Sequence, residues 1–261
     1  MGTKDVYAIP KEVTNMSDCH FYHTIDIPGH GLVQGEWDLR DGVREYLGSV
    51  NFKGKRVLEI GTASGFLCFW MENQGAEVIA YDLSENQSWD LVPFAQYDYK
   101  QLKVAHKEHI RRINNAFWLC HKAFKSKARM VYGTVYSVPE EVDMVDIATF
   151  GCVLLHLQNP FVALQNVLRF TRETVIITEP DPNLSLPANP SSRIPCMLFI
   201  PDFTKCEPKD TWWSFTPEII TRFIGLLGFE KSEVTYHSQK YKDRKEPLYT
   251  VVGHRTGDIY S

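Results

Sequence analysis

The chain has 261 residues, 44% of them hydrophobic, which is enough to bury one sizeable core and predicts a single domain over 1–261. Its net charge of −4 and pI near 6.1 disfavour nucleic acid as a partner, because binding to phosphates depends on clustered Lys and Arg. No stretch reaches the roughly 20 unbroken apolar residues of a membrane span, and the first residues lack the apolar core of a signal peptide, so we expect a cytoplasmic protein that contacts no membrane.

The six cysteines form no CxxC pair, and most lie in apolar surroundings, as Cys68 does between Leu67 and Phe69. That setting is typical of buried free thiols in a reducing compartment. The spacing therefore predicts no metal site, zinc included, and no disulfide framework.

Short apolar runs alternate with amphipathic segments through most of the chain. The runs at 56–60, 77–82, 128–132, 145–150 and 174–178 predict strands, and the segments at 66–73, about 106–124, 160 onwards and 217–227 predict helices. Asn159 and Thr216 each precede a proline and are expected to cap the helices that begin there. Continuous apolar strands between amphipathic helices indicate an α/β fold whose parallel sheet is covered on both faces.

The single domain divides into segments with different expected roles. Residues 1–52 are expected to form a lid over the cofactor, 53–178 the cofactor-binding core, 179–215 a proline-rich loop or lid without strands, and 216–261 a helix and a strand hairpin. Within that hairpin, the runs at 231–236 and 248–253 are separated by a charged turn at 240–246, and within the core, residues 83–105 look like an insertion.

A glycine-rich turn follows the first apolar strand of the core and predicts a cofactor site. Gly61, Thr62, Ala63, Ser64 and Gly65 are small enough for backbone to approach a ligand, and Glu59 precedes them. A dinucleotide site would show GxGxxG for its pyrophosphate, whereas these glycines are four apart. S-adenosylmethionine carries an ammonium, a sulfonium and a ribose diol, for which acidic residues are the useful partners.

Asp82 ends the second strand of the core, where an acid can accept hydrogen bonds from both ribose hydroxyls. We therefore place Glu59, Asp82 and the adjacent Leu83 in the cofactor site. The alternative is that the two acids only cap strands at the surface.

The order of these motifs resembles the class I methyltransferases, with Gly133-Thr134-Val135 after the third strand and Phe150-Gly151 ending the fourth. The resemblance implies a Rossmann-like fold with a seven-stranded, mostly parallel sheet whose last strand is antiparallel. It also implies that Thr134 and Val135 contact adenine and that Phe150 and Gly151 border the transferring methyl. Thr134 departs from the acid often found at its position.

A closer resemblance covers most of the chain. Tyr22 to Gly29, Trp37 to Arg40, Glu59 to Phe66, Leu154 to Pro160 and Trp212-Trp213 resemble the family of the tRNA wobble-uridine 5-oxyacetate transferase and its shorter small-molecule relatives. This resemblance implies carboxy-S-adenosylmethionine as a possible cofactor, whose extra carboxylate would need a cation such as Arg40, Lys53 or Lys55. Only about 55 residues precede the first strand, too few for a sizeable RNA-binding domain, which favours a small-molecule acceptor.

Methyl transfer from a sulfonium is an in-line displacement that asks the protein mainly to align the reactants and exclude water. His156, just past the fourth strand, is a candidate general base or else a packed histidine that orients its loop. His23, beside Tyr22 in the amino-terminal segment, is a second catalytic candidate or else a surface turn residue.

Further residues are expected at the two ends of the site. Trp37 and Arg40 are expected to close the methionine end of the cofactor, with a surface or capping arginine as the alternative. Aromatic side chains would line the acceptor pocket or else pack the lid onto the sheet; these are Tyr22, Tyr97, Tyr99, Trp212 and Trp213.

The sequence thus predicts an S-adenosylmethionine-dependent methyltransferase that acts on oxygen, nitrogen or sulfur of a small molecule. The alternatives are a tRNA wobble-uridine (carboxy)methyltransferase, a nicotinamide-dependent oxidoreductase, which the glycine spacing disfavours, and a binding module without catalysis. No pattern in the sequence selects an oligomeric state.

Overall fold

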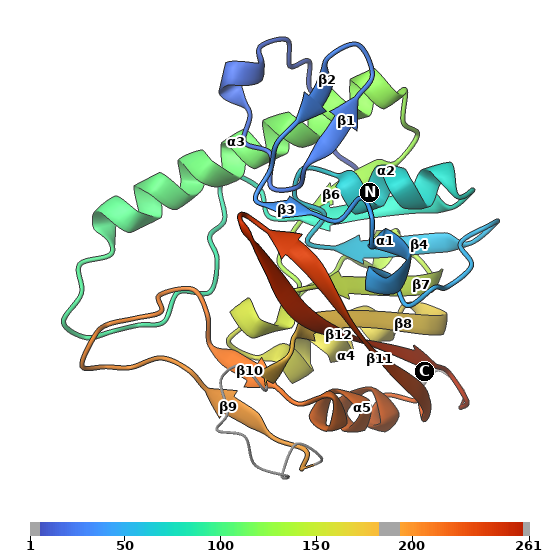
Figure 1. The fold of residues 1–261 in the computed structure, drawn as a ribbon, viewed down its shortest axis with the longest axis vertical. Coiled ribbons are helices and arrows are strands. Elements are labelled where there is room, and N and C mark those ends of the chain that lie inside the picture. The colour runs from blue at the N-terminus through green and yellow to red at the C-terminus, as the bar shows by residue number, and fades with distance from the viewer. Residues whose placement is uncertain (1–5, 183–193, 258–261) are drawn as a thin grey trace, which may run out of the picture.

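A computed structural model describes residues 6–182 and 194–257, and its centre is an eight-stranded sheet in the order β3-β11-β12-β8-β7-β4-β5-β6 (Figure 1). Five neighbouring strands are parallel: β8 (Thr171–Pro180), β7 (Val145–Gly151), β4 (Arg56–Ile60), β5 (Glu77–Asp82) and β6 (Arg129–Tyr132). The last strand, β12 (Arg244–His254), is antiparallel to β8, as expected.

The eighth strand is the difference from the expected seven. It is β3 (Trp37–Asp38), which pairs with the outer edge of β11 (Lys231–Tyr241) through Lys240↔Asp38 and Tyr241↔Trp37. A two-residue strand has no period to reveal it in a sequence, because alternation needs at least four residues to be seen.

Helices cover both faces of the sheet, as the alternating pattern predicted (Figure 1). Val57 and its neighbours on one face pack against α2 (Phe66–Asn73) and α3 (Lys100–Phe124), and Leu58 on the other face packs with α4 (Pro160–Leu168) and α5 (Pro217–Leu226). Successive strand residues point to opposite faces, so a strand buried on both sides must be apolar throughout.

Some element boundaries differ from those expected. Helix α3 begins at Lys100, so the irregular insertion covers only 83–99. The charged segment at 240–246 is mostly strand, because β11 and β12 continue to a two-residue turn at Lys242 and Asp243. Backbone pairing in an exposed hairpin needs no apolar side chains, so charge there does not end the strands.

The proline-rich segment contains two strands where none was expected. β9 (Met197–Phe199) and β10 (Trp213–Phe215) form an antiparallel pair with Trp213 opposite Phe199. Neither strand contains a proline, so the ladder between them is intact. Residues 183–193 of this segment lie outside the described residues.

Asn159 and Thr216 precede α4 and α5 as expected, but neither side chain makes a capping hydrogen bond. The Thr216 hydroxyl instead accepts the Cys196 N–H at 3.0 Å and lies 3.1 Å from the Ile194 carbonyl oxygen. Thr216 therefore anchors the chain that leads into β9 rather than the start of α5.

The amino-terminal segment contains a hairpin of β1 (Ile25–Ile27) and β2 (Gly31–Val33), and α1 (Val43–Tyr46) follows β3. It lies along α3 (Figure 1), where the Asn115 side-chain amide donates to the Asp18 carbonyl at 3.0 Å and the His20 N–H donates to the Arg112 carbonyl at 3.0 Å. Among the described residues, none of the helices is both long and apolar enough to cross a bilayer. All six cysteines are free thiols.

Candidate functional site

The turn between β4 and α2 is held in a backbone conformation that favours small residues. Gly61, Ala63 and Gly65 have φ values of +77°, +48° and +89°. A Cβ on Gly65 would also lie 2.4 Å from the Phe69 ring, so this position needs glycine for packing as well as for its φ. The turn stands at the carboxyl end of β4, where the strand order reverses between β5 and β7, and ligands of open α/β sheets bind at such a point.

Asp82 is joined to this turn. One of its carboxylate oxygens accepts the Ala63 N–H at 2.7 Å, and the other accepts the Leu83 N–H at 2.7 Å. Burial raises the pKa of Asp82, although both hydrogen bonds act in the opposite direction. Each oxygen keeps a lone pair, so the carboxylate can still accept hydrogen bonds from a diol.

Glu59 lies beneath the turn and is 2% exposed. Its Oε2 accepts the Thr62 hydroxyl at 2.6 Å, and burial raises the pKa of Glu59 to about 8. A small cavity of about 20 Å³ adjoins Glu59 at the carboxyl ends of β4, β7 and β8, and no described lysine or arginine lines it. The cavity therefore suits a cationic group, and it offers no described lysine or arginine to a phosphate.

The amino-terminal segment closes this cavity with Tyr22 and His23. The His23 N–H donates to the Ser64 hydroxyl at 3.3 Å, and its ring is 6% exposed with Nδ1 lacking a partner among the described residues. Burial lowers the pKa of His23 to about 4, which leaves the imidazole neutral and a weak base near pH 7. His23 lines the small cavity, and its catalytic role stays a prediction.

Trp37 and Arg40 are not brought to the cavity. The Trp37 indole donates to the Tyr22 hydroxyl at 3.3 Å and packs on Tyr241, so it supports Tyr22 from behind. Arg40 is exposed and forms a two-pronged pair with Asp38, with both N–O distances 2.8 Å.

The other two candidate cations do not line the small cavity either. Lys53 is exposed, and Lys55 pairs with Glu173 at 2.5 Å near the amino ends of β4 and β8. Because cofactors of this fold bind at the carboxyl ends, neither lysine is placed to meet a second carboxylate on a cofactor.

The predicted adenine and methyl contacts lie along the same edge of the sheet. The Tyr81 hydroxyl donates to the Thr134 carbonyl at 2.9 Å, while the Val135 side chain packs in the core and leaves only its backbone for a ligand. Phe150 and Gly151 line the small cavity at the end of β7. The structure thus gathers on one edge the residues that the sequence assigned to adenine and to the methyl group.

His156 lies in a 3-10 turn, η3 (Leu154–His156), after β7. Its Nδ1 stands 2.5 Å from the Asp210 carbonyl oxygen, so this nitrogen is the donor of the neutral ring. Nε2 is then left with its lone pair, which is the form a general base requires.

The four predicted aromatic residues outside the amino-terminal segment join loops to one another, and none of them lines the small cavity beside Glu59. The Trp212 indole donates to the Asp90 carbonyl at 2.7 Å, and the Trp213 indole to the Gln158 carbonyl at 3.4 Å. Tyr97 and Tyr99 pack edge to face within the insertion, with the Lys209 ammonium over Tyr97. These contacts agree with the alternative expectation, that the aromatic side chains pack the lid.

Comparison with known proteins identifies the family, because residues 34–217 match the model of a methyltransferase domain. The chain belongs to this family. A curated relative is the ribosomal RNA small subunit methyltransferase A of Mesomycoplasma hyopneumoniae, 23% identical over 136 residues, which are 51% of this chain and 49% of that protein. This methyltransferase thus spans about half the length of that relative.

Solved structures share its fold. The amino-terminal domain of EvdMO1 with SAH bound has a TM-score of 0.57 at 14% identity, over 90% of this chain and 92% of that one. The 1,6-didemethyltoxoflavin-N1-methyltransferase of Burkholderia thailandensis has a TM-score of 0.51 at 13% identity, over 84% and 78%. The methyltransferase therefore has the Rossmann-like class I fold.

Two residues that support the site were missed in the sequence. Asn114 is buried in α3, and its side-chain amide donates to the Leu83 carbonyl at 3.1 Å. The sequence could have indicated it, because it is a polar residue on the apolar face of a helix with a clear period. Tyr46 lines the small cavity from α1, and nothing in the sequence around it points there.

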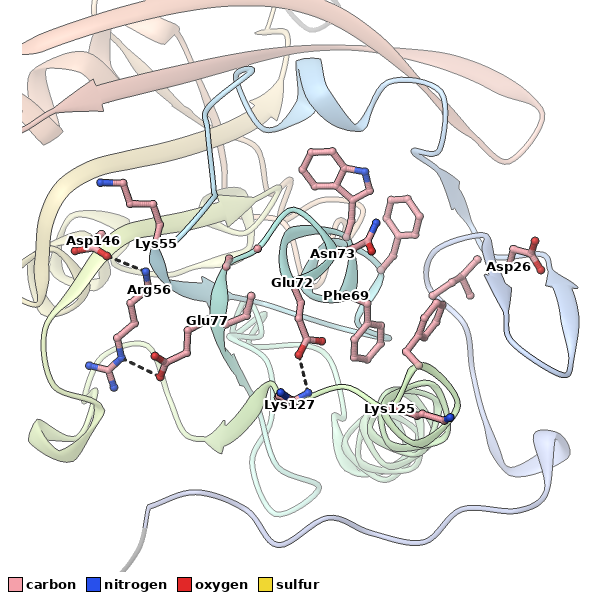
Figure 2. A pocket seen from close by; sticks show the side chains of 18 of the residues that line it. Asp26, Lys55, Arg56, Phe69, Glu72, Asn73, Glu77, Lys125, Lys127 and Asp146 are labelled. Atoms are coloured by element: carbon pink, nitrogen blue, oxygen red, sulfur yellow. Dashed lines mark hydrogen bonds and ion pairs between the residues drawn. The ribbon is translucent and has the colours of Figure 1, made fainter.

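A larger concavity of the methyltransferase, about 940 Å³, lies at the opposite edge of the sheet (Figure 2). Several of its charged groups have partners, since the Arg56 N–H donates to Asp146, the Arg56 guanidinium pairs with Glu77, and the Lys127 N–H donates to Glu72. Most of its lining comes from α2 and the amino ends of β4 and β5, although Phe66, next to the glycine-rich turn, also lines it; neither Glu59 nor Asp82 does, so it is not the candidate active site.

Proposed function

We propose that this methyltransferase uses S-adenosylmethionine and transfers its methyl group to oxygen, nitrogen or sulfur of a small molecule. The observation that carries the proposal is the buried Glu59 and the partly buried Asp82 on either side of a glycine-rich turn to which Asp82 is hydrogen-bonded. An acidic site suits a cofactor with an ammonium and a diol, and disfavours the pyrophosphate of a nicotinamide dinucleotide.

The residues present accommodate that cofactor. Glu59 is placed to hold the ammonium, Asp82 to accept the ribose hydroxyls, and the backbone at Leu83, Thr134 and Val135 to border the adenine. When bound, S-adenosylmethionine supplies a methyl group on a sulfonium that is ready for displacement. The protein has to align the acceptor with that methyl and exclude water, and the buried Phe150 beside the small cavity supports the exclusion of water.

Plain S-adenosylmethionine is favoured over its carboxylated form. Among the described residues that line the small cavity there is no lysine or arginine to meet an added carboxylate. Arg40 is engaged by Asp38, and Lys53 and Lys55 lie toward the other edge of the sheet.

A small acceptor is supported by the chain's net charge of −4 and by the solved methyltransferase that binds 1,6-didemethyltoxoflavin. The second candidate, an RNA acceptor such as a tRNA wobble uridine, is favoured by the relative that modifies ribosomal RNA and by three exposed lysines on α3, Lys100, Lys103 and Lys107. Binding of the protein to total tRNA separates the two candidates.

Substitution of Asp82 tests the cofactor site. We expect Asp82→Ala to weaken binding of S-adenosylhomocysteine by about tenfold to a hundredfold in calorimetry, since a hydrogen bond to a charged group contributes about 1.5–3 kcal/mol. Asp82 also accepts the Ala63 N–H, and Asp82→Ala removes that contact as well. Asp82→Asn keeps one acceptor oxygen, so we expect its affinity to lie between those of wild type and Asp82→Ala.

Asp26→Ala is the matched control, because Asp26 is an exposed aspartate at the far concavity. Unchanged affinity in a folded Asp82→Ala protein would remove Asp82 from the site. Wild-type protein that binds neither S-adenosylmethionine nor S-adenosylhomocysteine at millimolar concentration would overturn the proposed function itself.

A further inference from the structure

Another buried acid, Glu179, lies at the carboxyl ends of the strands, as the candidate site does. It is near the carboxyl end of β8, and the pairing Gly151↔Thr178 places it level with Cys152, the first residue after β7. The side chain is 1% exposed. Neighbouring residues of β8 point to opposite faces, so Glu179 and Thr178 project to different sides of the sheet.

The two carboxyl oxygens of Glu179 differ in their partners. Oε1 accepts the Leu154 N–H at 2.8 Å, which fixes the start of η3 and hence the turn that carries His156. Oε2 is fully buried and has no hydrogen-bond partner among the described residues. A buried polar atom without a partner is costly, and such atoms are rare unless a ligand supplies the partner.

The groups that face Glu179 provide no counter-charge. They are the Cys152 thiol after β7 and the phenols of Tyr46 on α1 and Tyr249 on β12, each with its pKa raised by burial and so neutral near pH 7. Burial also raises the pKa of Glu179 to about 8, against the backbone N–H groups of Val153, Leu154 and Leu155. A buried carboxyl without a cation destabilises a fold, and such groups gather at functional sites.

We propose that Glu179 faces the reacting centre from the acceptor side, and that its Oε2 takes the hydrogen bond and then the proton of a protic acceptor: a hydroxyl, a thiol, or an amine bearing hydrogen. This inference rests on the proposed function. The bond from the acceptor atom to the methyl carbon forms as the carbon–sulfur bond breaks. The sulfur keeps that electron pair, and the acceptor's proton passes to Glu179.

The cofactor itself provides a probe that needs no known acceptor. S-adenosylmethionine carries a fixed positive charge at sulfur, which S-adenosylhomocysteine lacks, and the two share the ammonium that Glu59 is placed to meet. A carboxyl beside the sulfur ionises more readily when the sulfonium is present. Binding of S-adenosylmethionine should therefore release a proton that binding of S-adenosylhomocysteine does not.

The experiment measures proton release for both ligands by calorimetry at pH 7.5, in two buffers with different ionisation enthalpies. We expect wild-type protein to release about half a proton more with S-adenosylmethionine, and Glu179→Gln to abolish this difference. The amide oxygen introduced by Glu179→Gln can still accept the Leu154 N–H, so a purely structural role for Glu179 would leave the difference unchanged. Glu173→Gln, at an exposed carboxylate on the same strand, is the matched control and should retain it.

Three outcomes overturn the inference. They are equal proton release for the two ligands in wild type, a difference that persists in Glu179→Gln, and the loss of the difference in Glu173→Gln. Binding of both ligands in wild type keeps the proposed function standing in each of these cases, whereas failure of both to bind overturns the function and the inference together. If Glu179→Gln does not fold, infrared difference spectra of wild type labelled with ¹³C-glutamate decide, since S-adenosylmethionine alone should remove a protonated-carboxyl band.

Discussion

Glu59, Asp82 and Glu179 are acids whose pKa values are raised by burial on one edge of the sheet. Each keeps hydrogen-bond donors, such as the Thr62 hydroxyl on Glu59 and the Leu154 N–H on Glu179, but no described lysine or arginine lines the cavity beside Glu59. Glu59 and Glu179, with pKa values of about 8, therefore hold protons near pH 7 that the unfolded chain would release. A cationic ligand would compensate the same charges.

This uptake of protons makes stability depend on pH in a direction opposite to that of a salt-bridged acid. The pKa of Glu59 is about 8 in the folded protein against an ordinary 4.5. Its stabilising effect is fully present below the lower value and is lost as pH rises through the higher one. We expect the free energy of unfolding of wild type to decrease between pH 5.5 and 8.5 as Glu59 ionises. In Glu59→Gln this decrease should be smaller, by up to a few kcal/mol.

Urea unfolding at the two pH values checks this expectation. The amide oxygen introduced by Glu59→Gln can still accept the Thr62 hydroxyl, so the comparison isolates the charge. Glu85→Gln, at an exposed acid of the insertion, should follow wild type. Equal pH dependence in Glu59→Gln and wild type would mean that Glu59 ionises normally in the folded protein.

The insertion at 83–99 and the residues before β10 act together as a layer beside the sheet. The Val92 N–H donates to the Lys209 carbonyl at 2.9 Å, and these two loops lie side by side in Figure 1. Asp90 is the central connection, since its carboxylate accepts the Gln158 N–H at 2.7 Å and the Tyr136 hydroxyl, and its carbonyl accepts the Trp212 indole.

Asp90→Ala tests that connection. It leaves the Gln158 N–H and the Tyr136 hydroxyl without their acceptor, so we expect about 1–3 kcal/mol less stability in urea unfolding. Hydrogen exchange should also quicken in the insertion and in the loop before β10, while the central strands stay protected. Glu85→Ala in the same insertion is the control, and similar exchange in the two variants would show that Asp90 does not hold the layer.

At the scale of the whole molecule, the strand order determines at which end of the strands a ligand can bind. The reversal at β4 brings together, at the carboxyl ends of the strands, the turn after β4, Asp82 at the end of β5, and the ends of β7 and β8. The larger concavity of Figure 2 lies mainly at the amino ends of the strands. Helix α3 projects beyond the sheet (Figure 1), and its first turns carry Lys100, Lys103 and Lys107 at exposed positions.

This charge distribution predicts weak, salt-sensitive binding to RNA. In filter binding with total tRNA, we expect the affinity to fall by about tenfold or more between roughly 50 and 200 mM salt, because a few lysines release only a few counterions. Replacing Lys100, Lys103 and Lys107 by Gln should remove most of the remaining binding. Tight binding that survives at the higher salt would favour the RNA acceptor over a small molecule.

Elements with a strong period were predictable from the sequence alone. The bounds of β4, α2 and β5 are those expected, because an apolar strand buried on both faces and a glycine-bounded helix carry their own signals. The turn at 61–65 was predictable for the same reason, since small residues and left-handed φ values occur together. The resemblance to the class I methyltransferases added Phe150 and Gly151 to the predicted site.

Long-range contacts decided the remainder. Arg40, which the sequence placed at the cofactor, forms its ion pair with Asp38 two residues away, while Tyr46 reaches the small cavity from α1. No local period records which face of β8 meets η3, or that Asp90 meets Trp212 from 122 positions away. The amino-acid order thus determined the strands, the helices and the cofactor turn, because those depend on neighbouring residues. Only the folded chain decided which acids are buried without a counter-charge, because burial depends on how the whole chain packs.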